Sequence, residues 1–503
     1  MNSPCPSLPT VRTDRDSFQA IMAEQLHHAP WVLLSVVLHG LVIALLWLIP
    51  AASPSAEAVV ATVVLPEAPA EFVEVPPPSE QVEPEPIDPE ELIFAAEPSE
   101  QPTAVAESPA ASFDETVDFA PVDLALATNV GLGGGTPARY GSRGLGKGRR
   151  GAFPGQANVE AGLRWLRDHQ DADGRWDCDD FMKHDLAGTA CDGAGDPLHD
   201  VGVTGLALLA FLGDGNTLRG GRDRDVVKRG VEWLREQQDH DTGCLGGQAS
   251  QHFMYDHAIA TLALCEAHGL SRYRSLRPCA QRAVDFLSAA RNPYGAWRYQ
   301  PRSGDNDVSI TGWALMALVS AHEFGLAVDG RALADVDVYL DQMTDAQGRV
   351  GYVQRGGPSS RHVGEHEAAF PVDRNEAMTG VGLFCKVLLG HDARTDPRLQ
   401  KQLAVLMRRK PAWEVGARGS SLDFYAWYYG SYAVYQVGEP HWSHWSNALT
   451  KAVIERQCRE GNAAGSWDPV DAWGADGGRV YSTAILTLAL QAYYRYARCI
   501  GGR

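Results

Sequence analysis

The chain has 503 residues, long enough for two or three domains, and 45% of them are hydrophobic, so we expect a sizeable buried core. Its formal net charge is −19, from 63 acidic and 44 basic side chains. The acidity lies mostly between residues 51 and 125 and says little about the partners of the folded part, for which we expect no nucleic acid.

The first predicted element is a transmembrane helix over residues 31–50. Residues 31–49 carry no charge and are almost entirely apolar. A helix of this length reaches roughly 30 Å, the thickness of the hydrocarbon core of a bilayer. Trp31 and Trp47 stand near its two ends, where membrane interfaces favour Trp. A cleaved signal peptide is the alternative, because small residues follow the apolar run.

Positive charge lies on one side of this span. Arg12 and Arg15 precede it, and no Lys or Arg follows until Arg139. The positive-inside rule therefore places residues 1–30 in the cytoplasm and the C-terminal part outside it, in the periplasm. The membrane is thus an expected partner of the chain.

Residues 51–155 are predicted to be a disordered linker. Between residues 51 and 125 there are 17 acidic side chains and no basic one, among many Pro and Ala residues. Such a composition cannot bury a core, and Pro together with charge repulsion keeps it extended. Residues 131–155 then become rich in Gly and basic side chains.

From residue 156 the sequence alternates between two kinds of predicted helix. Residues 200–210 (DVGVTGLALLA) and 307–317 (DVSITGWALMA) align without a gap and are apolar or small nearly all round. That pattern is typical of a helix buried on every side. Predicted helices of this kind begin at Asp200, Asp256, Asp307, Asn375, Asp423 and near Arg479.

Six amphipathic helices alternate with these apolar ones. The first two lie at residues 159–169 and 227–237, and the others begin near Cys279, Leu333, Leu399 and Asn447. A helix that is polar on one face belongs outside, and one that is apolar all round belongs inside. A hairpin repeated about every 56 residues therefore predicts an all-α (α/α)6 toroid of six helical hairpins over residues 156–503. An open solenoid of the same hairpins is the alternative.

The turns between the predicted helices carry a recurring Gly-x-Trp pattern. The residues of this pattern are Gln170, Gly174, Trp176, Gly295, Trp297, Gly465 and Trp467. They resemble the Gln-x-x-x-Gly-x-Trp motifs of the terpenoid cyclase and protein prenyltransferase superfamily, although Arg291 replaces the Gln in the second copy. The resemblance implies a toroid like that of squalene–hopene cyclases, with a polyisoprenoid lipid as the expected ligand of a central cavity.

In squalene–hopene cyclases an Asp-x-Asp-Asp motif opens an inner helix, and its middle Asp protonates the substrate. Asp305 and Asp307 match this motif at the start of a predicted inner helix, whereas Val308 replaces its last Asp. The resemblance implies that Asp305 and Asp307 are catalytic. The alternative is that Asp307 only caps its helix, because an Asp carboxylate accepts from the first free backbone N–H groups.

Further residues near the starts of predicted inner helices are candidates for lining the cavity. They are Asp256, His257, Trp313, Asp423, Trp427, Tyr428 and Tyr481. Aromatic rings stabilise carbocations through their faces, stack on sugars, or simply pack in a core. We predict no cofactor and no metal: prenyltransferases of this fold hold zinc with an Asp-x-Cys pair and a later His, and no Asp-x-Cys begins an inner helix here.

Three loops contain other polar residues. The segment 177–180 (DCDD) fits the Asp-x-Asp-Asp letters but follows an outer helix, which favours a solvated loop or a weak calcium site over an acid catalyst. The segment 362–367 (HVGEHE) lies in an insertion that we interpret as a loop over the cavity mouth, with metal binding as the alternative. Cys178 and Cys191 flank a polar loop and would close it as a disulfide in an oxidising compartment.

Three functions are open on the sequence alone, because a fold does not determine a function. The first is an enzyme or binder for a polyisoprenoid lipid, which a deep apolar cavity would favour. The second is a non-catalytic module that contacts another protein of the cell envelope, which a filled centre would favour. The third is a glycan-active toroid, which an open polar and aromatic groove would favour.

The predicted topology leads to a first test. We expect alkaline phosphatase fused after residue 503 to be active in cells, because the charge-free span and the flanking arginines place that end outside the cytoplasm. Reporter activity confined to a cytoplasmic fusion partner would contradict this topology.

Overall fold

The computed structural model describes residues 155–293, 295–358, 365–417 and 419–496. The predicted cytoplasmic tail, transmembrane helix and linker lie outside these residues and stay predictions. Among the described helices, none combines the length and the apolar character needed to cross a bilayer.

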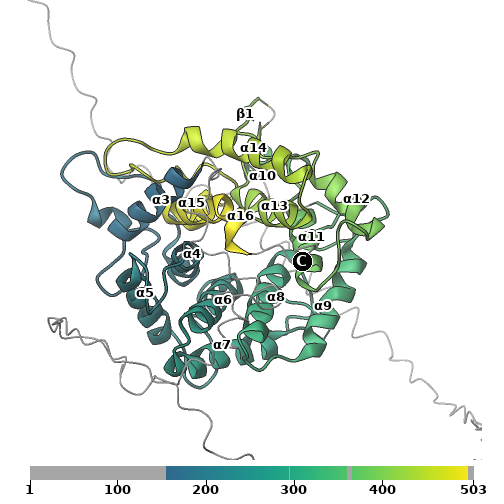
Figure 1. Cartoon of the computed structure of the whole chain (residues 1–503), viewed down its shortest axis with the longest axis horizontal. Coiled ribbons are helices and arrows are strands. Elements are labelled where there is room, and N and C mark those ends of the chain that lie inside the picture. Colours follow the sequence, from purple (N-terminus) through teal and green to yellow (C-terminus); the bar gives the residue numbers. More distant parts are fainter. Residues whose placement is uncertain (1–154, 294, 359–364, 418, 497–503) are drawn as a thin grey trace, which may run out of the picture. The chain divides into compact units, whose positions relative to one another are not determined.

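The described residues form two concentric layers of helices around one axis (Figure 1). The inner helices are α4 (Asp200–Gly213), α6 (Phe253–Ser271), α8 (Val308–Glu323), α11 (Ala377–Leu388), α13 (Phe424–Val437) and α15 (Gly474–Leu490). The outer helices are α3 (Gln156–Asp168), α5 (Arg224–Glu236), α7 (Arg277–Ala290), α9 (Gly330–Met343), α12 (Pro397–Leu406) and α14 (His441–Val453). The all-α toroid of six hairpins is thereby confirmed.

Smaller elements connect these helices. They are α10 (Glu365–Ala369), α16 (Ala492–Arg495), the 3₁₀ helices Phe181–His184, Pro197–His199, Arg274–Leu276, Val372–Arg374 and Ile454–Arg456, and the antiparallel strands β1 (Val415–Gly416) and β2 (Gly419–Ser420). The predicted inner-helix starts agree with the structure to within a few residues. At the last inner helix, Gly478 has φ 63° and interrupts α15, so its regular part begins at Arg479.

The ring closes on itself. Helix α15 packs against both α3 and α4, which brings the last hairpin against the first. Hydrogen bonds join the same two hairpins: Asn158 Nδ2 donates to Gln457 Oε1 (2.6 Å), and Gln457 Nε2 donates to the Asn158 carbonyl (2.9 Å). The open solenoid is therefore wrong.

The Gly-x-Trp turns fasten each outer helix to the next inner helix. Trp176, Trp297 and Trp467 are fully buried. The indole N–H of Trp176 donates to the carbonyl of Leu166 at 2.7 Å, and its backbone N–H donates to Thr204 Oγ1 at 3.0 Å. The other two Trp residues make the same pair of contacts in their repeats. The structural role predicted for the motif is thus present in three repeats.

Backbone conformation explains the Gly of the motif, and hydrogen bonds explain its Gln. Gly174 has φ 104°, and a Cβ there would lie 2.2 Å from the carbonyl oxygen of Arg229, so only Gly fits. Gln170 donates to the carbonyls of Gly174 and Val226 and so bridges two hairpins. Gln238 and Gln457 bridge their own neighbours in the same way, although the sequence pattern identified only Gln170.

Aromatic side chains fill the centre of the ring. Trp313 of α8 stacks on Tyr428 of α13, with ring centroids 5.4 Å apart and planes 17° from parallel. Ser309 Oγ and the Tyr425 hydroxyl also join these helices, at 2.8 Å. Helix α11 separates α8 from α13 along the ring, so these contacts cross the interior. Trp313 and Tyr428 therefore lie inside the ring, as predicted, but packed against each other.

The last described residues close one end of the ring interior. Helix α16 turns into the ring (Figure 1), and Arg495 and Glu266 form an ion pair of 2.7 Å in which both side chains are 0% exposed. The Tyr496 hydroxyl donates to the other carboxylate oxygen of Glu266 at 2.7 Å, and Arg495 also donates to the Leu209 carbonyl. The centre is thus sealed by residues of the same chain.

Two cavities lie between the inner and outer helices. One, of about 110 Å³, is lined by Trp427, Trp445 and basic side chains near the starts of α11 and α13. The other, of about 320 Å³, is lined by residues of α8, α9 and α11, among them Val319 and Leu388. Trp427 therefore faces the space between the layers, and its predicted place in a central cavity is corrected.

The buried ion pair allows a stability test. Replacing Arg495 by Met should lower the free energy of unfolding by about 3–5 kcal/mol, because Glu266 would stay buried without its counter-ion. A Glu266→Gln, Arg495→Met double variant should recover much of the loss, whereas Arg394→Met, at an exposed ion pair, should change little. Urea unfolding measures the stability of all three variants. A negligible change in the free energy of unfolding of Arg495→Met would contradict a buried ion pair between Arg495 and Glu266.

Candidate active site

Asp307 stands at the start of α8 and is 0% exposed. Its Oδ1 accepts the backbone N–H of Ile310 at 2.9 Å, which is the contact of a helix N-cap. Its Oδ2 makes no hydrogen bond of good geometry among the described residues, and the nearest cation, Arg298 Nε, is 4.0 Å away. Burial raises the pKa of this carboxyl to about 7, although the Ile310 N–H, Arg298 and the nearby Tyr352 hydroxyl act in the opposite direction.

Tyrosine side chains surround this carboxyl. The backbone N–H of Val308 donates to the Tyr352 carbonyl at 3.0 Å, which places Tyr352 beside the start of α8. The hydroxyls of Tyr299 and Tyr352 are 2.5 Å apart, and Tyr255 packs near Tyr299 with ring centroids 6.3 Å apart. Burial, and then the negative charge of Asp307, raises the pKa of Tyr255 and of Tyr352. These hydroxyls are therefore neutral polar groups over a dry carboxyl.

Asp305 occupies a different environment from Asp307. Its side chain is 58% exposed and pairs with Arg298 at 2.7 Å, while Arg298 lies over the ring of Tyr299 at 4.8 Å. The structure does not bury the two predicted catalytic residues together. Asp305 is linked to Asp307 only through Arg298, which contacts both carboxyls.

A pair of buried carboxyls lies at the start of α13. Asp423 Oδ1 accepts from the Ala426 N–H at 2.8 Å and from Trp473 Nε1 at 3.2 Å, and Asp471 Oδ2 accepts from the Phe424 N–H at 2.9 Å. The other oxygen of each carboxyl has no hydrogen-bond partner among the described residues. Burial raises the pKa of Asp423 to about 6, and burial together with the charge of Asp423 raises that of Asp471 well above its usual range.

Sequence reasoning found Asp423 but missed Asp471. Asp471 lies in the loop before α15, where no helix pattern marks it, and only the fold brings it to Asp423. The Tyr481 hydroxyl lies 3.5 Å from Asp471 Oδ2, so Tyr481 belongs to this pair. Helix α10 packs nearby, because His366 Nε2 lies 2.9 Å from the Ala472 carbonyl. His362 of the predicted metal-binding segment lies outside the described residues.

The remaining acids at the inner-helix starts have close cations. Asp200 pairs with Arg175 at 3.0 Å, and Asp256 pairs with His199 at 3.1 Å. Glu376, beside the start of α11, pairs with Arg349 at 3.1 Å. Asp307, Asp423 and Asp471 differ from these acids because no cation lies within normal hydrogen-bonding distance of their carboxyls in the described part of the chain.

Two other predicted features have structural roles. His257 was expected to line the cavity, but its Nδ1 accepts from the Leu245 N–H (3.0 Å) and its Nε2 lies 3.2 Å from the Ala283 carbonyl on an outer helix. Burial lowers its pKa to about 3, so it is a neutral core residue. Asp177 of the 177–180 segment contacts Lys183 at 2.7 Å and Arg175 at 3.0 Å, and one oxygen each of Asp177, Asp179 and Asp200 lie within 4.8 Å of one another, so a weak calcium site stays a prediction.

No family model matches the sequence, and no curated protein matches it. Solved structures that resemble the fold include type II terpene cyclase MstE from Scytonema, with a TM-score of 0.43 and 13% identity, over 67% of this chain and 97% of that chain.

Two further solved structures resemble the fold. The GH76A alpha-1,6-mannanase from Salegentibacter sp. HEL1_6 has a TM-score of 0.44 and 10% identity, over 67% of this chain and 98% of that chain. A UGL structure with dGlcA-Glc-Rha-Glc has a TM-score of 0.48 and 14% identity, over 69% of this chain and all of that chain. At such values the likenesses assign neither a family nor an activity to this chain.

The raised pKa of Asp307 predicts a pH-dependent stability. Below its ordinary pKa of 3.8 the carboxyl is protonated in both the folded and unfolded states, and its contribution is lost as the pH rises through about 7. The difference between 3.8 and about 7, at about 1.4 kcal/mol per pKa unit, sets an upper limit of about 4 kcal/mol. Asp307→Asn should therefore gain stability relative to the natural chain between pH 4 and pH 8.

Asp307→Ala is the matched control for this measurement. It also removes the ionisable group but loses the cap, so it should be about 1 kcal/mol less stable than Asp307→Asn at every pH. Thermal unfolding followed by circular dichroism measures both differences. A constant difference between the natural chain and Asp307→Asn across the pH range would contradict a buried, protonatable Asp307.

Proposed function

We propose that the chain is an acid–base enzyme in which Asp307 donates a proton to an alkene of a polyisoprenoid lipid. One observation carries the proposal: Asp307 is fully buried, its Oδ2 makes no hydrogen bond of good geometry among the described residues, and its pKa is raised to about 7. Such a carboxyl carries a proton near neutral pH and is shielded from water, as a general acid requires, and the positive charge of Arg298, 4.0 Å away, stabilises the carboxylate left after proton transfer.

The surroundings of Asp307 suit an apolar substrate. Protonation of an alkene carbon breaks the O–H bond of Asp307, forms a C–H bond and leaves a carbocation on the neighbouring carbon. Faces of Tyr and Trp rings stabilise a cation without reacting as strong bases, and the rings of Tyr255, Tyr352 and Tyr425 lie around the carboxyl. Loss of a proton from a carbon beside the cation completes the reaction, with isomerisation or cyclisation as the net result.

Access to Asp307 requires movement of its cover. The carboxyl is 0% exposed, and the hydrogen-bonded pair of Tyr299 and Tyr352 lies beside it. Tyr299 is partly exposed, so this pair is the side of the site that solvent reaches. We propose that a lipid enters by displacing these rings. The predicted span at residues 31–50 would hold the ring close to a bilayer, where such lipids reside.

A glycan-active toroid is the second candidate, and the Asp423–Asp471 pair favours it. Most glycoside hydrolases use two carboxyl groups, one as an acid and the other as a base or nucleophile. Two buried carboxyls with different pKa values meet that requirement. The aromatic residues Tyr481 and Trp473 beside them would stack on a sugar ring.

A non-catalytic module of the cell envelope is the third candidate, and the filled centre favours it. Trp313 and Tyr428 occupy the interior of the ring, and Arg495 seals one end. Such a ring would present its outer surface to a partner protein and would need no proton donor.

Product analysis on the purified full-length chain in detergent distinguishes the candidates. We expect squalene or a linear prenol to be converted, and Asp307→Asn to lower the rate by about 100-fold or more, the usual contribution of a general acid. Asp305→Asn, the matched control, keeps the buried proton and should retain more activity. Gas chromatography with mass spectrometry detects the products.

Three results would contradict the lipid proposal. Full lipid conversion by Asp307→Asn would remove Asp307 from the mechanism. Cleavage of oligosaccharides that Asp471→Asn abolishes, with no lipid product, would establish the second candidate instead. The third candidate, a non-catalytic module, would be established if neither substrate class is turned over and Asp307→Asn binds an envelope protein as well as the natural chain does.

A further inference from the structure

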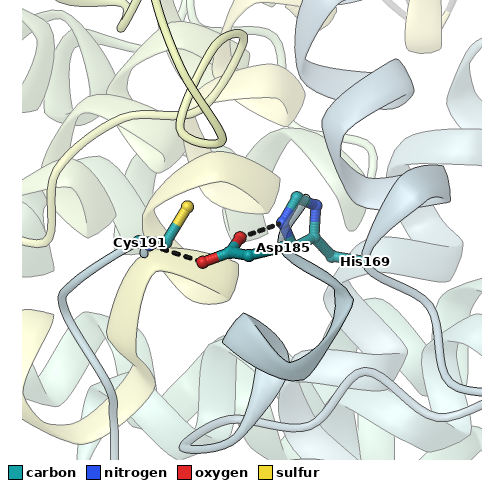
Figure 2. A group of neighbouring side chains, drawn as sticks. All are labelled: His169, Asp185 and Cys191. Carbon is teal, nitrogen blue, oxygen red and sulfur yellow. Dashed lines mark hydrogen bonds and ion pairs between the residues drawn. The ribbon is translucent and has the colours of Figure 1, made fainter. Parts of the chain in front are cut away.

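A cluster of metal-ligating side chains lies outside the site described above. His169 follows α3, and Asp185 and Cys191 lie in the loop that leads to α4. Figure 2 shows the three side chains turned toward one another. One ligand atom of each, the His169 ring nitrogen, an Asp185 oxygen and Cys191 Sγ, lies within 4.8 Å of the other two. The side chains of His169 and Asp185 are only 6% and 7% exposed, and Cys191 is buried.

Both ring nitrogens of His169 face hydrogen-bond acceptors. Its Nδ1 lies 2.8 Å from the Trp165 carbonyl, and its Nε2 lies 3.2 Å from Asp185 Oδ1. A neutral imidazole has only one N–H to donate. With that proton on Nδ1, the lone pair of Nε2 faces the carboxylate, which is unfavourable unless a second proton or a metal cation lies between them. A backbone carbonyl on the second nitrogen is the usual support of a metal-bound His.

We propose that His169, Asp185 and Cys191 bind a zinc ion. Nitrogen, oxygen and thiolate sulfur are the ligand types of tetrahedral zinc, and their metal distances of about 2.0–2.3 Å require only a small closure of the present cluster. Binding breaks the S–H bond of Cys191 and releases that proton to solvent. The negative charges of the Asp185 carboxylate and the Cys191 thiolate then balance the charge of Zn²⁺. Water completes the fourth position.

Residues from the far end of the chain position this cluster. The Trp165 ring stacks on His169 with centroids 4.1 Å apart, and Trp165 Nε1 donates to the Asn462 carbonyl at 2.9 Å. The Asn462 side chain donates to the carbonyls of Leu186 and Thr189, both at 3.0 Å, and so fixes the loop that carries two of the ligands. The zinc ion would therefore lie where the first and last hairpins meet, and would stabilise the closure of the ring.

The zinc site excludes the disulfide predicted from the sequence. Cys178 and Cys191 are both free thiols in the structure. Cys191 cannot bind zinc while it is bonded to Cys178. Whether Cys191 is a thiolate or half of a disulfide therefore decides between the zinc site and the disulfide. The cluster is also independent of the proposed proton donor, because none of its residues contacts Asp307 or Asp471.

Metal analysis of the full-length chain tests the proposal. After dialysis against micromolar free zinc, elemental mass spectrometry should find about one zinc ion per chain. Replacing zinc by cobalt should give the charge-transfer absorption of a thiolate–cobalt bond. Chelation should lower the Tm of the natural chain but not that of Cys191→Ser.

Variants separate zinc binding from loss of folding. Cys191→Ser and His169→Gln should weaken zinc binding at least about tenfold, whereas Cys458→Ser, a partly exposed cysteine away from the cluster, should bind as the natural chain does. Cobalt absorption needs no variant, so it tests the site even where a variant unfolds. Cobalt binding without the thiolate band, no retained zinc, or isolation of Cys191 in a disulfide with Cys178 would each overturn the proposal.

Discussion

The burial of the inner-helix starts is the constraint on which the rest of this structure depends. A helix that begins inside a protein leaves backbone N–H groups that water cannot reach, and they need acceptors from the chain. Asp307 and Asp423 supply them through one carboxylate oxygen each. The same burial raises the pKa of both carboxyls. Capping and acid chemistry are thus compatible, because one oxygen binds the helix while the other is available for a proton.

Neighbouring cations distinguish the other acids from these two. Asp200 and Asp256 lie close to Arg175 and His199, which partly offset their charge, although burial still raises the pKa of both carboxyls. Asp307 has only Arg298 at 4.0 Å, and that side chain is engaged at 2.7 Å by the exposed Asp305. Aromatic packing fills the interior, and Arg495 seals one end of it.

Sequence periodicity was sufficient to predict the toroid, because alternating apolar and amphipathic helices of a fixed repeat have few other ways to bury their surfaces. It also placed Asp307 and Asp423, since caps precede helices at a fixed spacing. Asp471 and Tyr352 were beyond its reach, because loops carry them and only the closed ring brings them to their partners. The orientation of His257 was predicted wrongly for a related reason. The sequence of a helix buried on every side gives no signal of which residues point toward the centre of the ring.

The proposed acid role depends on the protonation state of Asp307 near neutral pH, which infrared spectroscopy measures directly. A difference spectrum between the natural chain and Asp307→Asn cancels the contributions of Asp423 and Asp471 and isolates one carboxyl. We expect a protonated-carboxyl stretch that disappears with a midpoint near pH 7. A carboxylate signal that persists down to about pH 4, the range of an ordinary aspartate, would contradict it.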